Sequence, residues 1–220
     1  MNKTQTYKVI LVDDHILLRD ALATLINGFD GFRVIDVAAN GRELINILSK
    51  SVIPNLIILD LNMPQMDGYE TTRWLMENHP EINILILTMY DSEIALIRLL
   101  QAGVRGFLKK DIHPDELKAA IISVAENGYY YSNSTTGKLA SFFHKSHSEN
   151  TSIEKAMFNE KEIEFLKLAS SDMTYKEIAQ KMQLTPRAID GYRDSLFDKL
   201  DVRSRVGLAI YALKNGVVTF

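Results

Sequence analysis

The stretch LIILDLNMPQMDGYE, residues 56–70, opens with a short apolar run that ends on a single acid, Asp60, and passes directly into a Met-Pro and Asp-Gly turn. Parallel strands that are buried on both faces read as short apolar runs. In open α/β sheets, ligands bind beyond the carboxyl ends of such strands. The stretch therefore predicts a buried parallel strand with Asp60 at the edge of the sheet where a site is expected.

Apolar runs and segments of helical periodicity alternate on both sides of this stretch. Together with residues 55–60, the apolar runs cover residues 7–12, 32–38, 82–88 and 104–109. The segments of helical spacing cover residues 16–27, 41–50, 68–78, 92–102 and 115–127. Alternation of strands and helices favours a parallel sheet with helices on both faces, so we expect an α/β domain with five parallel strands.

The pattern changes after Gly128. Residues 129–153 are rich in Ser, Asn, Thr and His, which is typical of a linker, and one short helix is expected around residues 135–144. Only helical patterns follow. We therefore expect the sheet domain at residues 1–128, a linker at residues 129–153 and an all-α domain at residues 154–220.

The amino-acid composition argues against disulfide-bonded and strongly basic classes of protein. The chain has no cysteine, which excludes disulfides and thiolate chemistry, and 25 basic residues stand against 28 acidic ones. The N-terminus has an apolar run too short for a signal peptide or a membrane span, so a cytoplasmic protein without membrane contact is expected. Residues 150–220 carry 11 basic and 10 acidic residues, so charge alone argues little for nucleic-acid binding.

Five polar residues follow the ends of the predicted strands. Asp13 and Asp14 follow the first, Asp60 the third, Thr88 the fourth and Lys110 the fifth. Because the strands are parallel, these side chains meet at one edge, where repulsion among three carboxylates is relieved by a hard cation such as Mg²⁺. Such a cation with a lysine opposite suits phosphoryl transfer to Asp60 as nucleophile, with Lys110 and Thr88 binding phosphate oxygens.

Two alternatives compete with this interpretation of the five residues. A single Asp after a strand is often a turn or helix-capping residue, but the five residues together are not explained in that way. A haloacid-dehalogenase-like phosphatase also uses an Asp nucleophile with Mg²⁺, yet its second Asp stands two residues on, whereas Asp13 and Asp14 are adjacent. We therefore do not expect an enzyme.

The motifs VDDH (12–15), LDLNMPQMDG (59–68), LT (87–88) and GFLKKD (106–111) resemble the receiver domain of bacterial two-component response regulators, over about residues 5–128. The resemblance implies a flavodoxin-like fold and phosphorylation of Asp60 by a histidine kinase.

The same resemblance implies roles for individual residues. Mg²⁺ is expected on Asp14, Asp60 and the backbone carbonyl of Asn62, with Asp13 acting largely through water. Lys110 matches the lysine of the family, so Lys109 is expected to point elsewhere. Thr88 and Phe107 match the switch pair, whose hydroxyl moves to the phosphate while the aromatic ring turns inward.

The second half contains two helical segments joined by a tight turn, TYKEIAQKMQ and RAIDGYRDSLFDKL, with LTP between them. Ile178, Met182, Leu184, Ile189 and Leu196 have the spacing of a helix-turn-helix core. Thr185 is a suitable N-cap with Pro186 at the first helical position. From the pattern alone, any helical hairpin is an equal alternative.

Residues 154–218 resemble the four-helix LuxR-type DNA-binding domain of the NarL/FixJ subfamily of response regulators. The resemblance implies that the helix at residues 186–200 enters the major groove. Asp190 departs from the pattern, because many relatives have a lysine there and an acid repels phosphates, although it can accept from a cytosine amino group. The expected DNA contacts are Lys176, Thr185, Arg187, Asp190, Tyr192, Arg193, Lys199 and Arg203.

These expectations combine into a response regulator transcription factor. Phosphorylation of Asp60 with Mg²⁺ is expected to favour a homodimer on paired half-sites of promoter DNA. The alternative, prompted by Asp190 and Asp194, is a receiver-controlled module in which the C-terminal helices bind a protein and do not read DNA.

Overall fold

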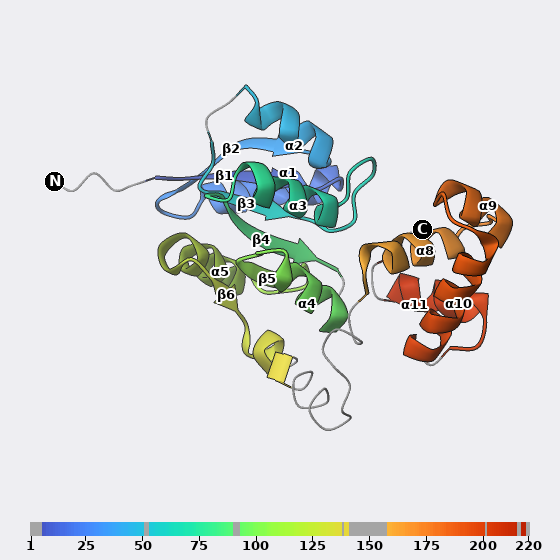
Figure 1. The fold of residues 1–220 in the computed structure, drawn as a ribbon. Helices are drawn as coiled ribbons and strands as arrows, with labels where there is room; N and C mark the ends of the chain where they lie inside the picture. Colours follow the sequence, from blue (N-terminus) through green and yellow to red (C-terminus); the bar gives the residue numbers. More distant parts are fainter. Residues whose placement is uncertain are drawn as a thin grey trace. The chain divides into compact units, whose positions relative to one another are not determined.

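The computed structural model describes residues 6–50, 53–89, 93–137, 139–140, 158–200, 202–214 and 217–218 (Figure 1). These residues form two compact units, a sheet unit and a helical unit. Within this described part of the chain, no helix combines the length and the apolar character needed to cross a lipid bilayer.

The sheet unit is built on six parallel strands in the order β2-β1-β3-β4-β5-β6. The strands are β1 (Tyr7–Val12), β2 (Phe32–Ala38), β3 (Leu56–Leu59), β4 (Asn83–Thr88), β5 (Gly106–Lys109) and β6 (Tyr130–Tyr131). The stretch predicted as a buried strand is β3, whose four residues are all buried between two neighbouring strands. An apolar side chain at every position is what burial on both faces requires.

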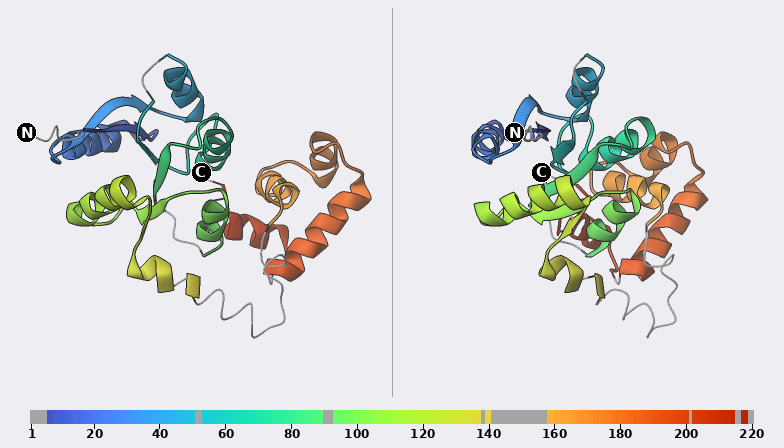
Figure 2. Two further views of the ribbon diagram at one scale, coloured as in Figure 1. Left: turned by 60° about the vertical axis from the view of Figure 1, so that its left-hand side comes forward. Right: turned by 90° about the vertical axis from the view of Figure 1, so that its left-hand side faces the viewer.

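Five helices cover this sheet: α1 (Ile16–Asn27), α2 (Gly41–Leu48), α3 (Gly68–Asn78), α4 (Glu93–Gln101) and α5 (Pro114–Asn127). Helices α1 and α5 lie on one face, and α2, α3 and α4 lie on the other (Figure 2). Local sequence explains the start of α3, because Asp67 and Glu70 form a capping box there. The α/β architecture predicted from the alternation of runs is confirmed.

The strand register brings the polar residues of the sequence to one edge. Val12 of β1 pairs with Leu59 of β3, and Thr88 of β4 pairs with Lys109 of β5. The residue after β3 continues the first of these pairings, because the amide of Asp60 donates to the Val12 carbonyl (2.9 Å). The turns that follow these strands are thereby held at the carboxyl edge of the sheet.

The sheet has one strand more than predicted. Tyr130 and Tyr131 fall in the segment expected to be a linker, but they form β6 and pair with Gly106 and Phe107 of β5. The difference arises because Gly128 ends α5 with φ 85°, a left-handed conformation that turns the chain back toward the sheet. A short helix is expected at residues 135–144. Within that range, residues 135–137 and 139–140 are helical, in a segment that begins at residue 133, and the remainder lies outside the described residues.

The helical unit contains α8 (Glu160–Ala169), α9 (Tyr175–Lys181), α10 (Pro186–Leu200) and α11 (Arg205–Lys214). Its core joins side chains from all four helices, among them Phe165, Ile178, Ile189, Leu196 and Leu208. The four helices confirm the all-α fold expected of this segment.

The turn between α9 and α10 has the chemistry that its sequence predicts. Gln183 adopts a positive φ of 56°, and the amide of Leu184 donates to the Ala179 carbonyl (2.9 Å). The Thr185 hydroxyl accepts from the amide of Ala188 (3.2 Å), as expected of the N-cap of α10. The turn is therefore closed by hydrogen bonds at both ends.

Arg205, the first residue of α11, ties three elements of the helical unit together. Its guanidinium donates to the carbonyls of Ala169 and Ser171, each at 2.8 Å, and to the carbonyl of Met173. These carbonyls belong to the end of α8 and to the loop before α9, where no helical amide is available to them. Arg205 therefore closes the end of α8 from a position 36 residues further along the chain.

We expect Arg205→Ala to lower the free energy of unfolding of the helical unit by about 2 to 4 kcal/mol, because three carbonyls lose a charged donor. Chemical denaturation followed by circular dichroism would measure the change. Arg203→Ala is the matched control, because Arg203 is exposed, and it should change stability by less than about 0.5 kcal/mol. Equal effects of the two substitutions would contradict the role assigned to Arg205.

Candidate functional site

The carboxyl edge of the sheet holds a buried cluster of opposite charges. Asp13 and Asp60 are each only 4% exposed. The ammonium nitrogen of Lys110 lies 2.7 Å from Oδ2 of Asp13 and 2.8 Å from Oδ2 of Asp60. A carboxylate from the end of β1 and one from the end of β3 thus share a single lysine that follows β5.

Burial sets the electrostatics of this cluster. Burial raises the pKa of the Asp60 carboxyl above its ordinary value, and the nearby ammonium of Lys110 offsets only part of this effect. Burial acts to lower the pKa of Lys110, but the carboxylates of Asp60 and Asp13 outweigh it and raise that pKa. Lys110 therefore stays protonated, and its charge holds two carboxylates that would otherwise repel each other.

Asp14 and His15 extend the cluster toward solvent. The imidazole Nδ1 of His15 lies 3.1 Å from Oδ1 of Asp13 and 3.0 Å from Oδ1 of Asp14. Oδ1 of Asp14 is buried and accepts no hydrogen bond from the described residues. His15 was not among the predicted site residues, although the motif VDDH contains it directly after the two acids.

The donor set of this cluster fits a divalent cation. Ligand atoms of Asp13, Asp14, His15 and Asp60 all lie within 4.8 Å of one another. Three carboxylates against the ammonium of Lys110 and the guanidinium of Arg19, which donates to the Asp13 carbonyl (2.8 Å), leave excess negative charge. One buried oxygen of Asp14 has no hydrogen bond within the described residues. Carboxylate oxygens are the ligands that Mg²⁺ prefers, so the residues present are compatible with that ion.

The loop after β3 brings backbone close to Asp60. The amide of Leu61 donates to Oδ1 of Asp60 (2.8 Å), which fixes the orientation of the carboxylate. Gly68 at the start of α3 packs so closely that a Cβ there would clash with the carbonyl oxygen of Asp60 and with Cα of Leu61. Asn62, whose carbonyl is expected on the metal, lies in this loop and is half-buried. A glycine is thus required at position 68 because the backbone of Asp60 and Leu61 lies too close for a side chain there.

Of the two residues predicted as a switch, Thr88 lies beside the cluster and Phe107 is buried on β5. Thr88 at the end of β4 is fully buried, and its carbonyl accepts from the amide of Lys110 (2.9 Å). Phe107 is 3% exposed. Lys109 points away from Asp13 and Asp60, because its ammonium is paired with the exposed Asp111 at 3.1 Å.

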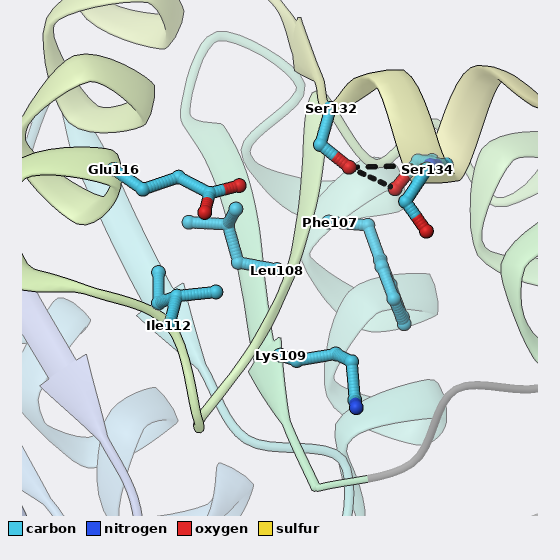
Figure 3. Close-up of a pocket in the computed structure, with 8 residues that line it drawn as sticks. Phe107, Leu108, Lys109, Ile112, Glu116, Ser132 and Ser134 are labelled. Carbon is cyan, nitrogen blue, oxygen red and sulfur yellow. Dashed lines mark hydrogen bonds between the residues drawn. The ribbon is translucent and has the colours of Figure 1, made fainter.

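A pocket of about 160 Å³ borders β5 where β6 ends. Figure 3 shows Phe107 and Lys109 on its walls, opposite Ser132 and the short helical segment that contains Ser134. The hydroxyl oxygens of Ser132 and Thr135 are 3.0 Å apart, so Ser132 caps this segment. Because Tyr131 of β6 pairs with Phe107 of β5, this capped segment begins next to Phe107.

Helix α10 presents a polar face to solvent. Its exposed residues beyond the first position recur with helical spacing and are Arg187, Asp190, Gly191, Asp194, Ser195 and Asp198. Five of the eight predicted DNA contacts are exposed, namely Lys176, Thr185, Arg187, Asp190 and Arg203. The predicted helix-turn-helix therefore carries an accessible surface on α10 and at its N-terminus.

The other three predicted DNA contacts are engaged within the helical unit. Tyr192 is half-buried, and its ring is stacked 6.2 Å from that of Phe165. The ammonium of Lys199 lies 3.1 Å from Glu162 in an ion pair whose side chains are 16% and 9% exposed. Arg193 is paired with two acids of its own helix. The structure therefore places these side chains in contacts that join or stiffen helices.

Two family descriptions match the sequence. "Response regulator receiver domain" matches residues 9–122, just over half of the 220 residues, and "Bacterial regulatory proteins, luxR family" matches residues 156–212. The first range contains the acidic cluster, and the second contains the helix-turn-helix.

Proteins of similar sequence match along almost their whole length. The oxygen regulatory protein NreC of Staphylococcus haemolyticus (strain JCSC1435) is 30% identical over 217 residues, covering 97% of this chain and all of NreC. The response regulator GacA of Pseudomonas syringae pv. syringae (strain B728a) is 29% identical over 211 residues, covering 96% of this chain and 97% of GacA.

Solved structures share the fold. A LuxR-family two-component response regulator from Aurantimonas sp. SI85-9A1 has 28% identity and a TM-score of 0.59, covering 64% of this chain and 99% of its own. RcsB from Salmonella enterica serovar Typhimurium, bound to the promoter rprA with the phosphomimetic BeF3−, has 22% identity and a TM-score of 0.69, covering 94% and 98%.

Proposed function

The chain belongs to the response regulators that join a receiver domain to a luxR-family regulatory domain, and we propose that phosphorylation of Asp60 controls its binding to promoter DNA. It is a response regulator transcription factor, and the luxR-family match does not favour the alternative of a protein-binding module. The observation that carries the proposal is the ion-paired cluster of Asp13, Asp60 and Lys110 at the carboxyl edge of the sheet.

In the proposed reaction, a carboxylate oxygen of Asp60 attacks the phosphorus of a phosphohistidine on a sensor kinase. A P–O bond forms as the P–N bond breaks, which gives an aspartyl phosphate. The ammonium of Lys110 is already 2.8 Å from the Asp60 carboxylate, so it reaches the new phosphoryl oxygens with little movement. The hydroxyl of Thr88 binds a second oxygen, and Phe107 fills the space that this hydroxyl leaves.

A cation belongs to this proposal. Asp13, Asp14, Asp60 and the backbone carbonyl of Asn62 would hold Mg²⁺, which when bound supplies positive charge against the phosphoryl oxygens. The buried oxygen of Asp14 and the excess negative charge of the cluster support this assignment. The reaction changes the state of the chain itself, and we propose no other substrate.

At the helical unit, we propose that α10 lies in the major groove of DNA. The exposed Arg187, Lys176 and Arg203 bind phosphates beside it. Lys199 holds α10 to α8 through its ion pair with Glu162. A homodimer on paired half-sites, acting in the cytoplasm, completes the proposal. The structure of RcsB on promoter DNA in the presence of a phosphomimetic supports this link between phosphorylation and DNA binding.

The proposal is tested by incubating the full chain with acetyl phosphate, with and without Mg²⁺. Intact mass spectrometry should show the addition of one phosphoryl group only when Mg²⁺ is present. Gel-shift titrations at several salt concentrations should then show DNA binding that weakens as salt rises. A phosphorylated protein without salt-sensitive affinity for DNA would refute the proposed function.

Lys176→Ala should weaken DNA binding about equally for all sequences. Lys176 is exposed on α9, and loss of one phosphate contact should reduce the slope of log affinity against log salt by about 0.9. Lys161→Ala removes the same charge from the exposed surface of α8 and is the control. An unchanged salt slope in Lys176→Ala would show that this lysine binds no phosphate.

A further inference from the structure

The exposed face of α10 is acidic. Of its charged residues, Arg187 is basic, whereas Asp190, Asp194 and Asp198 are acidic. A helix that enters the major groove passes between two rows of phosphates, and each exposed carboxylate is repelled by them. Acids on this face therefore lower the affinity for DNA of any sequence. An acid that accepts a hydrogen bond from one particular base can offset this loss at DNA sites that contain that base.

Arg193 compensates two of these acids. Its guanidinium nitrogen Nη1 donates to Oδ1 of Asp190 (2.9 Å), while Nε and Nη2 lie 2.9 Å from Oδ1 of Asp194. The guanidinium also lies 5.8 Å from the centre of the Tyr175 ring. A planar guanidinium held at several points limits the motion of the carboxylates that it binds. Asp190 is thereby held in one orientation and partly neutralised.

One oxygen of Asp190 remains available. Its Oδ1 accepts from Arg193, whereas Oδ2 makes no hydrogen bond to any of the described residues. The side chain is 55% exposed and lies within the first two turns of α10. In helix-turn-helix proteins, base contacts come from the N-terminal part of the recognition helix. A carboxylate in the major groove can accept a hydrogen bond from N4 of cytosine. Adenine also presents an amino group there, but beside its N7 acceptor, to which a carboxylate cannot donate.

From this geometry we propose that Asp190 reads a cytosine amino group in the DNA site and that Arg193 positions its carboxylate. The inference rests on the proposed DNA-binding function and adds the base that the helix selects. Asp190 contacts the base directly, whereas Arg193 is a positioning residue that acts through Asp190.

The neighbouring Gly191 supports a close approach of this part of the helix. Gly191 is exposed on the same face, and apart from its chain neighbours and the backbone of its own helix no atom of the described residues lies within 4 Å of the place where its Cβ would be. Packing within the unit therefore does not require a glycine, although glycine in a helix interior costs stability. The absence of a side chain beside Asp190 leaves room for a base edge.

The test is selection from a randomised DNA library by the full chain phosphorylated with acetyl phosphate, followed by sequencing. The wild-type protein should prefer cytosine at one position of each half-site. In Asp190→Asn, the ratio of affinities for cytosine over the other bases at this position should fall on the order of 10-fold. The variant should select adenine more often, because asparagine can form two hydrogen bonds with adenine. Asp198→Asn removes the same charge from the same face and should keep the preference for cytosine.

Arg193→Lys tests the positioning role. It should weaken discrimination of cytosine while costing no more than the small stability of exposed ion pairs, because Lys keeps the charge. It should add nothing to the loss of discrimination in the Asp190→Asn background, because both changes act on one contact.

Two outcomes distinguish failure of the inference from failure of the function. If the wild-type protein selects DNA but Asp190→Asn gains affinity for all sequences alike and keeps the same base preferences, Asp190 only repels phosphates and the inference is overturned. If the wild-type protein recovers no DNA above background, the proposed function itself fails and the inference falls with it.

Discussion

Asp60→Asn is expected to abolish phosphorylation of the chain and the gain in DNA affinity that follows from it. An amide nitrogen or oxygen cannot replace the carboxylate as nucleophile, so no aspartyl phosphate can form. Because Asn has nearly the same shape, Lys110 can keep its contact with Asp13 at 2.7 Å and the fold should persist. Intact mass after treatment with acetyl phosphate and Mg²⁺, with gel-shift titrations on the same samples, measures both losses.

Asp111→Asn is the matched control for this experiment. Asp111 lies one residue beyond Lys110, and its side chain is 64% exposed and paired with Lys109 on the surface. This variant should accept the phosphoryl group on Asp60 as the wild-type protein does. If Asp60→Asn still gained the mass of a phosphoryl group, and a variant of another acid did not, that other acid and not Asp60 would be the phosphoryl acceptor.

The candidate site was predictable because its residues sit at strand ends. Parallel strands deliver their carboxyl ends to one edge, so the positions of Asp13, Asp60 and Lys110 along the chain indicate that they meet. The motif around Lys110 also separated it from Lys109, which points to Asp111. The periodicity of apolar residues and the order of the strand ends along the chain are therefore enough to predict most of the sheet unit and its candidate site.

Features that depend on contacts distant in sequence were not predictable. Strand β6 has only two residues, too few for a recognisable period, and it depends on the left-handed turn at Gly128. Lys199 is basic and lies on α10, which predicts a DNA contact, whereas its ion pair with Glu162 on α8 is not visible in the sequence. Which partner takes a charged side chain is decided by packing between helices, and a linear pattern does not show that packing.

The second large effect is expected from Lys110→Met, measured in the absence of divalent cations. The ammonium of Lys110 is the counter-charge that lies between Asp13 and Asp60, whose side chains are 6% and 3% exposed. Removing one partner of a buried ion pair leaves uncompensated charge, so the free energy of unfolding of the sheet unit should fall by about 3 to 5 kcal/mol. Urea denaturation in the presence of EDTA would measure this loss.

Mg²⁺ should then stabilise Lys110→Met more than it stabilises the wild-type protein, because a cation that binds only the folded state adds most where the acids lack a counter-charge. Asp60→Asn placed in the same background should restore part of the lost stability, since only Asp13 then remains buried without its lysine. Lys109→Met removes a surface ion pair 3.1 Å long and should cost no more than about 1 kcal/mol. If Lys110→Met were as stable as Lys109→Met, or if Mg²⁺ stabilised both variants equally, Lys110 would not be the charge that holds the acidic cluster together.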